Sequence, residues 1–218
     1  MLFGCSSGPA MRVDDGMLAK VPPGAMQGVI EARANRDQAA DAVSKAEIDI
    51  TKARNEADLV RSELKIAESE VEQAKLKVEI AKQQGNAEAV QDAEAAAAIA
   101  RATVDVKKKL LNLRLRQIEE AEARLELAKI LLEKAEAEVE LAKARAVQGL
   151  DDPRAREISV SRFQLQVTEY KSKVARAEEE VAAVGVEVEE AQKIYDEAKR
   201  RLDAMTAPAA TVPAAAAP

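Results

Sequence analysis

The stretch from Ile118 to Ala142, IEEAEARLELAKILLEKAEAEVELA, repeats every seven residues. One position of each repeat carries a large apolar residue, and the position three residues later carries alanine. The large residues are Ile118, Leu125, Leu132 and Val139, and the alanines are Ala121, Ala128, Ala135 and Ala142. Residues spaced three and four apart line one face of an α-helix, and a heptad sustained this long calls for a partner helix. Glu, Lys and Arg at most other positions indicate that the remaining surface is solvated.

The composition extends this interpretation to the whole chain. Charged residues make up 33% of the 218 residues and aromatic residues only 2%, a balance typical of long helices and coiled coils. There is no His, the commonest general base and metal ligand. No phosphate loop, zinc spacing or nucleophile elbow occurs. We therefore expect no enzyme, no cofactor, no metal site and no small-molecule substrate.

The charge and the hydropathy exclude further classes of protein. The net charge of −6 argues against nucleic acid as a partner, because phosphate binding needs a basic surface. No apolar run is long enough to cross a bilayer. The single cysteine, Cys5, excludes a disulfide within the chain.

Heptads and turn residues predict three helices, over about 25–84, 87–148 and 153–205. Pro22, Pro23 and Gly24 stop any earlier helix. Gly85 and Asn86 are left-handed residues that end helices, and the heptad phase breaks there, so we expect the chain to reverse. The alternative at this point is one continuous helix with a stutter in its heptads.

The second turn carries a separate set of signals. Gly149 is a candidate for the residue that ends the second helix, Asp152 for the N-cap of the third, and Pro153 for its first position. Short turns force neighbouring helices to be antiparallel. The predicted fold is all-α: a long antiparallel three-helix coiled-coil bundle, up-down-up, over residues 25–206.

Both ends of the chain differ from this body. Residues 1–28 are rich in Gly, Pro and Ser, so we expect an irregular, disordered or extended segment, with 1–24 as a tether. Residues 207–218 are rich in Ala and Pro, so we expect an extended, mobile tail.

Three charged residues interrupt the apolar seams: Arg36, Lys107 and Arg114. Because an unpaired buried charge is costly, we expect each to pair or to reach solvent. If the chain reverses near Asn86, Arg114 comes opposite Asp58, and Lys107 comes near Glu63 and Glu68. Around the second turn, Arg114 comes level with Glu187 and Glu189. Such residues fix the register of helix pairing.

A second apolar stripe supplies candidates for partner binding. It runs along the first two predicted helices, about 110° from the main seam. The candidate residues are Leu59, Ile66, Ile80, Ile99, Val106 and Leu113. On the second helix this stripe is expected to pack on the third helix. On the first helix it can form an exposed patch that binds another subunit or a partner helix.

The first residues carry a short motif. Leu2-Phe3-Gly4-Cys5 resembles the lipobox of bacterial lipoproteins, and Ser6 and Ser7 resemble the polar tether that follows its cysteine. The resemblance implies that Cys5 is lipidated and that the protein is anchored to the outer membrane, facing the periplasm. The basic and apolar leader of that family is missing or truncated here. The alternative is a free thiol in an irregular tail.

The predicted function follows from the shape and this motif. We expect a non-enzymatic periplasmic lipoprotein, a helical spacer, scaffold or assembly subunit of a cell-envelope complex. In form it resembles the helical hairpins of periplasmic efflux and secretion adaptors and coiled-coil envelope lipoproteins. Its partners are envelope proteins or further copies of itself, contacted through helix faces. The alternatives are a cytoplasmic coiled-coil assembly protein and an apolipoprotein-like binder of lipid surfaces.

Overall fold

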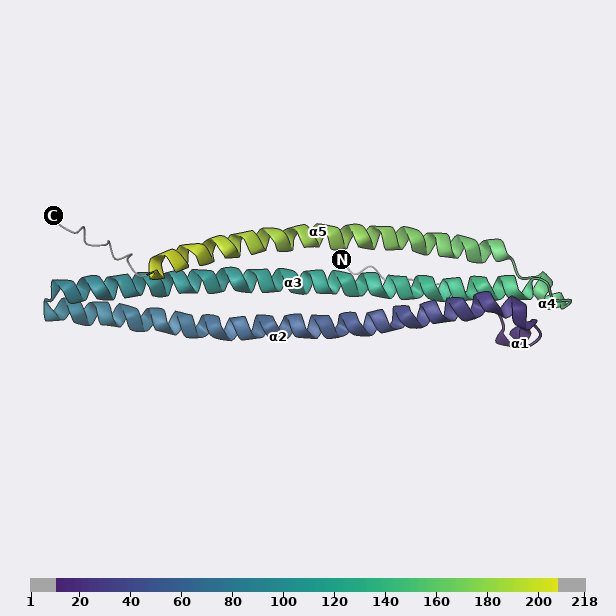
Figure 1. Ribbon diagram of the computed structural model, residues 1–218, viewed down its shortest axis with the longest axis horizontal. Coiled ribbons are helices and arrows are strands. Elements are labelled where there is room, and N and C mark those ends of the chain that lie inside the picture. Colours follow the sequence, from purple (N-terminus) through teal and green to yellow (C-terminus); the bar gives the residue numbers. More distant parts are fainter. Residues whose placement is uncertain (1–10, 208–218) are drawn as a thin grey trace, which may run out of the picture. The chain divides into compact units, whose positions relative to one another are not determined.

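A computed structural model describes residues 11–207, and within that range the chain is all-α, with long helices that pack against each other and no strand (Figure 1). The elements, in order, are α1 (Asp15–Leu18), the 3-10 turn η1 (Pro23–Met26), α2 (Gln27–Gln84), α3 (Ala87–Val147), α4 (Pro153–Arg156) and α5 (Val160–Thr206). The predicted all-α class is confirmed. The predicted lipidation residue, Cys5, and the Ala/Pro-rich tail from 208 onward lie outside the described residues.

The connection between α2 and α3 is built by two residues with different roles. Gly85 has a φ of 67°, the left-handed conformation that glycine adopts without a steric cost. Asn86 is not left-handed, contrary to the prediction. Its Oδ1 accepts hydrogen bonds from the N–H groups of Glu88 (3.1 Å) and Ala89 (3.2 Å), so it caps the first turn of α3. The chain therefore breaks here, and the alternative of one continuous helix is wrong.

The connection between α3 and α5 departs further from the sequence pattern. Asp152 caps α4 by accepting from the N–H of Arg154 at 3.0 Å, and Pro153 occupies the first turn, as predicted. Gly149 lies two residues after the end of α3 at Val147, close to the predicted end of the second helix, but without a positive φ. The predicted helix 153–205 is interrupted after α4, where the N–H of Ile158 donates to the carbonyl of Ala155 and ends the turn. The interruption lets Ile158 pack against the apolar core beside it.

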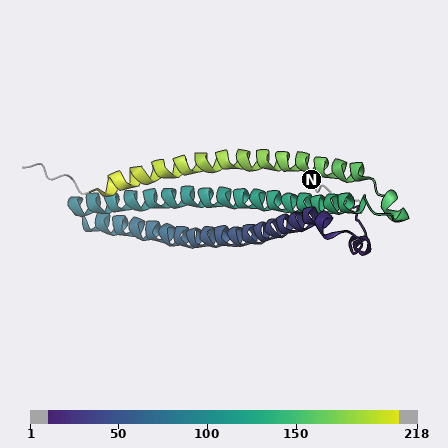
Figure 2. The same ribbon diagram turned by 45° about the vertical axis from the view of Figure 1, so that its right-hand side comes forward.

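The chain divides into two compact units, the first formed by residues 11–51 and 120–184. It contains α1, η1, the start of α2, the end of α3, α4 and the start of α5 (Figure 2). Its core is one apolar cluster of ten buried residues. They are Val13, Met17, Leu18, Val21, Ala137, Leu141, Ala144, Val147, Phe163 and Val167.

The expectation that residues 1–28 are disordered or extended is wrong for the part from Met11 onward. Val13, Met17, Leu18 and Val21 are all buried. Their spacing of four, one and three residues places them on one side of a short helical turn, and that side faces the apolar cluster. Residues 11–26, called here the anchor segment, belong to the core of the first unit.

The second unit contains residues 52–119 and 185–207. Its buried residues are mostly small, as the alanine heptads predict. They are Ala57, Val60, Ala67, Ala74 and Ala81 on α2, Ala97, Val106 and Leu113 on α3, and Ala191 and Ala198 on α5. Alanine lets helix backbones approach closely and gain dispersion contacts, although each alanine removes little apolar area from water.

Ion pairs show how α2 and α3 align in this unit. Lys82 Nζ lies 3.0 Å from Glu94 Oε1, Lys107 Nζ lies 2.7 Å from Glu63 Oε2, and Arg114 Nη1 lies 2.9 Å from Glu56 Oε2. Residue numbers rise along α3 as they fall along α2. The two segments are therefore antiparallel, as the turn at Gly85 requires.

Candidate functional site

The anchor segment is attached by a buried polar network as well as by its apolar residues. At its centre is Lys143 of α3, a residue only 8% exposed. Its Nζ lies 2.8 Å from Asp15 Oδ1 and 2.9 Å from Glu140 Oε1. The other oxygen of Glu140, Oε2, accepts a hydrogen bond from the N–H of Val13 at 2.7 Å. One lysine and one glutamate of α3 thus hold both the backbone and a side chain of the anchor segment.

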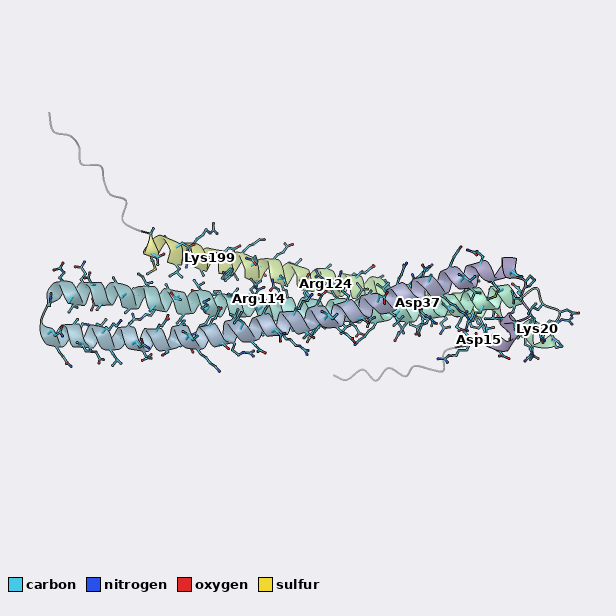
Figure 3. All side chains as sticks on the ribbon, turned by 60° about the horizontal axis from the view of Figure 1, so that its bottom comes forward. Asp15, Lys20, Asp37, Arg114, Arg124 and Lys199 are labelled. Atoms are coloured by element: carbon cyan, nitrogen blue, oxygen red, sulfur yellow. The ribbon has the colours of Figure 1, made fainter. Side chains whose placement is uncertain are left out.

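A second set of ion pairs ties the anchor segment to the start of α4. Lys20 Nζ lies 2.9 Å from Oδ2 of the buried Asp152, and Arg154 Nη1 lies 3.2 Å from Asp14 Oδ2. Figure 3 labels Asp15 and Lys20, which lie at the end of the first unit that carries α4. The carboxylate of Asp152 therefore caps α4 and also binds Lys20 of the anchor segment, so it positions both elements.

The pKa values of these groups follow from their contacts. Hydrogen bonds from Lys20 and Arg154 hold the pKa of Asp152 well below its usual range. The hydrogen bond and the charge of Lys143 lower the pKa of Asp15. Burial opposes the charged form of Lys143, but the carboxylates of Asp15 and Glu140 outweigh it and raise the pKa of the ammonium group. All three groups are therefore charged across the neutral pH range.

An open groove lies beside the anchor segment, and charges of both signs line it. Arg33 and Arg36 come from α2, Glu133 and Glu136 from α3, and Tyr170 from α5. Burial, followed by the charges of Glu133 and Glu136, raises the pKa of Tyr170. The groove therefore presents two arginines and two glutamates beside a tyrosine.

The predicted partner-binding residues fall into two groups. On α2, Leu59 and Ile66 are each 61% exposed and Ile80 is 53% exposed. On α3, Val106 and Leu113 are buried within the chain, and Ile99 is half-buried. The α2 residues alone therefore make an exposed apolar face, and a role in partner binding remains a prediction for them.

One exposed apolar residue of this face escaped the sequence pattern. Leu76 is 59% exposed but lies outside the stripe of residues repeated every seven positions. Leu76 lies three residues after Gln73 and four before Ile80. A helical row with spacings of three and four therefore includes it, provided that the row may pass through the polar Gln73.

The charged residues in the seams pair largely as expected. Lys107 pairs with Glu63, as predicted. Arg114 pairs with Glu56 and not with the predicted Asp58, because Asp58 accepts a hydrogen bond from Arg61 one turn along its own helix. Its neighbour Arg116, and not Arg114, reaches Glu187 of α5, at 2.9 Å.

Arg36, the third of these residues, pairs with the adjacent Asp37 at the surface. Like Lys107 and Arg114, it has an acidic partner, so each charge that interrupts a seam is compensated.

Two kinds of feature are absent from the described residues. None of the helices within 11–207 has the length and the apolar character needed to cross a membrane. The same range holds no cluster of three or more side chains suited to binding a metal ion. No protein-family model, curated protein or solved structure matches this chain.

Proposed function

We propose that this chain is a non-enzymatic, lipid-anchored helical spacer or scaffold of a bacterial cell envelope. The lipid is carried by Cys5 in the lipobox-like Leu2-Phe3-Gly4-Cys5, and the helices extend from the outer membrane into the periplasm. The observation that carries the proposal is the attachment of the anchor segment. The described chain begins in a segment fixed to α3 and α4 by four buried apolar residues and by pairs to Glu140, Lys143 and Asp152.

The attachment matters because the segment after Cys5 can hold the helices near a membrane only if its other end is fixed to them. Val13 lies eight positions after Cys5, and eight positions of fully extended chain span at most about 29 Å. A lipid on Cys5 therefore holds the first unit within that distance of the membrane. Acyl chains contribute about 0.8 kcal/mol per buried CH₂, so more than one chain gives a stable anchor.

The proposal includes the arrangement of the helices along their full length. We propose that α2, α3 and α5 form an up-down-up coiled-coil bundle. The reversal at Gly85 and the antiparallel ion pairs of α2 and α3 support this arrangement. At 1.5 Å per residue, the 61 residues of α3 span about 92 Å, the distance over which such a spacer can separate two objects.

Spin-label distances test this arrangement. Cys5→Ser removes the one native thiol, and pairs of new cysteines at exposed positions then carry the labels. Ser62→Cys with Arg162→Cys, diluted with an excess of unlabelled chain so that only distances within one chain contribute, reports on the arrangement of the two units. The proposed bundle gives one narrow distance distribution for such a pair. A broad distribution contradicts it.

The test of the anchor uses the full chain expressed from its own gene in its own cells. We expect an alkyne fatty acid fed to the cells to label the protein, and the label to survive boiling in detergent. Cys5→Ser abolishes the label and releases the protein from the membrane fraction. An unmodified free thiol at Cys5 in protein from these cells overturns the proposal and supports the cytoplasmic coiled-coil alternative.

A flotation assay separates lipid anchoring from direct binding of the helices to lipid. Unlipidated full chain carrying Cys5→Ser is mixed with vesicles of phosphatidylethanolamine and phosphatidylglycerol. We expect it to stay with the soluble fraction, because most of its apolar side chains are packed on each other and the exposed apolar face of α2 is narrow. Flotation with the vesicles supports the apolipoprotein-like alternative and contradicts a purely lipid-borne anchor.

A further inference from the structure

The exposed face of α2 in the second unit carries an apolar seam that the rest of the described chain, residues 11–207, leaves exposed. Leu59, Ile66, Leu76 and Ile80 are each between 53% and 61% exposed. At 100° per residue, these four side chains fall within about 100° of one another around the helix. Residues buried against the rest of the unit, such as Val60 and Ala67, lie on a different face. We call these four residues the outer seam.

The outer seam has the spacing of a coiled-coil interface. Leu59, Ile66, Gln73 and Ile80 repeat every seven residues, and Ser62, Ser69 and Leu76 follow the first three of them by three residues. This is a second heptad on the same helix, offset from the one that packs on α3. A helix with two heptads pairs with two helices, and in this unit Glu56, Glu63, Glu68 and Lys82 of α2 all form their ion pairs with α3.

We propose that the outer seam is a self-association surface, and that a second copy of this chain docks on it in parallel and in register. In that alignment each large apolar residue meets its own counterpart: Leu59 meets Leu59, Ile66 meets Ile66 and Ile80 meets Ile80. Gln73 meets Gln73, and the two amides can hydrogen-bond to each other, as buried polar pairs do in parallel dimers. An antiparallel alignment centred on this stretch brings Leu59 against Leu76, but it sets Ile66 against Ser69 and Ile80 against Asn55.

The charges beside the outer seam favour the same alignment. In a parallel pair, the residue that directly precedes Leu59, Ile66 or Gln73 faces the residue five positions later on the partner. That rule pairs Lys65 with Glu70 and Glu72 with Lys77, so the charges are opposite in both cases. Within the described residues, Lys65, Glu70 and Lys77 form no ion pair of their own. They are therefore available to a partner.

One pairing in this alignment brings like charges together, but its cost is small. Asp58 faces Glu63 of the second copy. Each of these carboxylates already has a cation within its own chain, since Arg61 lies 2.7 Å from Asp58 and Lys107 lies 2.7 Å from Glu63. In the antiparallel alignment, Glu63 faces Glu70, and Glu70 has no such partner.

The area of the outer seam indicates a weak dimer. Four half-exposed Leu and Ile side chains leave roughly 400 Å² of apolar surface, about half of what one partner contributes to a standard interface. Association in the micromolar range is expected for such a surface. The parallel direction rests on the proposed function in one respect: two copies anchored in one membrane by their N-terminal segments already point the same way, and their confinement raises the effective concentration.

Disulfide crosslinking of the full chain tests this proposal. In a Cys5→Ser background, Ser62→Cys and Ser69→Cys each place one thiol at the outer seam. We expect mild oxidation at micromolar concentrations to give covalent dimers of both variants. Lys75→Cys, on the opposite side of α2, is the matched control and is expected to remain monomeric.

Two further variants show whether the seam drives the crosslink. Ile66→Asp is expected to reduce dimer formation by Ser62→Cys at least tenfold. Val186→Asp replaces an equally exposed valine on α5 and is expected to leave dimer formation by Ser62→Cys unchanged. Circular dichroism of each variant establishes that its helices remain folded.

The outcomes separate the possible errors. Crosslinking of Ser69→Cys without Ser62→Cys indicates an antiparallel pair and overturns the parallel alignment. Crosslinking no faster than that of Lys75→Cys overturns self-association altogether. Because these proteins carry no lipid, failure of acylation at Cys5 in cells leaves the crosslinking result intact, and the two proposals can fail separately.

Discussion

Lys143 Nζ lies 2.8 Å from Asp15 Oδ1, which joins the end of α3 to a segment 128 residues earlier in the sequence. The lysine side chain is 10% exposed, and that of Asp15 is 70% exposed. The contact therefore lies at the boundary of the core, where a buried cation meets a carboxylate that water can reach. Glu140, whose side chain is 15% exposed, completes the charge balance from the buried side.

The first prediction concerns Lys143→Met, which keeps the volume of the side chain and removes its charge. Glu140 then keeps its charge in a buried position with only the N–H of Val13 as partner. Exposed ion pairs contribute about 0–1 kcal/mol, and loss of one partner of a buried pair costs about 3–5 kcal/mol. We expect the free energy of unfolding to fall by about 2 kcal/mol, measured by urea denaturation.

Lys75→Met is the matched control for this measurement. Lys75 also pairs with a glutamate three residues away, Glu72, but both side chains are largely exposed. Its effect on the free energy of unfolding should stay within about 0.5 kcal/mol. Equal effects of the two substitutions would show that the polar network at Lys143 does not stabilise the fold.

The heptad pattern predicted the long helices well but could not predict this contact. Lys143 follows Ala142, the last small residue of the repeat, and the heptad pattern predicts that it lies beside the seam and is exposed to solvent. It is buried because the anchor segment covers it. The apolar residues of that segment, such as Met17, do have helical spacing, but they cover only about two turns and lie among Gly, Asp and Pro, which predicted an irregular segment. Its stability comes from a surface built by α3 and α5, and a local pattern does not reveal such distant partners.

Ion-pair geometry shows a similar limit at finer scale. The antiparallel register placed Lys107 beside Glu63 correctly, because both lie next to the seam. It failed for Arg114, because competition from Arg61 for Asp58 depends on side-chain conformations that the register does not fix. The exposed face of α2 was predicted from Leu59, Ile66 and Ile80, while Leu76 was missed because it lies outside the sevenfold repeat.

The second prediction is that acid releases the anchor segment before the helices unfold. The pKa values of Asp15 and Asp152 are lower in the folded chain than their ordinary value of 3.8. Their contribution to stability is therefore present above about pH 4 and is lost as the pH falls through the folded values. The raised pKa of Lys143 affects stability in the opposite pH direction. Its contribution to stability is present below pH 10.5 and is lost at higher pH.

The methyl group of Met17 reports on this release in NMR spectra of the full chain labelled with ¹³C-methyl methionine. Met17 is buried at 4% exposure, so its signal should differ from that of the exposed Met205 at neutral pH. We expect the Met17 signal to move to the position of Met205 below about pH 4, while the far-ultraviolet circular dichroism remains helical. If the Met17 signal moved and the helical circular dichroism was lost at the same pH, a separate release of the anchor segment would be contradicted.

The third prediction separates a glycine required by its backbone conformation from two that are not. No atom lies within 4 Å of a Cβ added at Gly85, so Gly85→Ala meets no steric obstacle except its φ of 67°. We expect it to lower the free energy of unfolding by about 1 kcal/mol. Gly28→Ala, in the first turn of α2, and Gly149→Ala have equally open surroundings and no positive φ. Both should be neutral or stabilising by up to about 1 kcal/mol in the same thermal or urea denaturation.

The fourth prediction tests the register of α2 and α3 by exchanging the charges of one pair. Lys107 Nζ lies 2.7 Å from Glu63 Oε2, with both side chains about one-third exposed. Lys107→Glu places two carboxylates at this contact, and Glu63→Lys places two ammonium groups there. For such partly exposed pairs we expect each single substitution to lower the free energy of unfolding by about 1 kcal/mol. The double substitution restores the attraction with its direction reversed, so it should recover at least half of the loss, and the double-mutant cycle measures the coupling directly. The same cycle with Lys107 and Asp58, which lies five residues before Glu63 and pairs with Arg61 instead, should give additive effects. Additivity for Lys107 and Glu63 would mean that the two helices pair in another register.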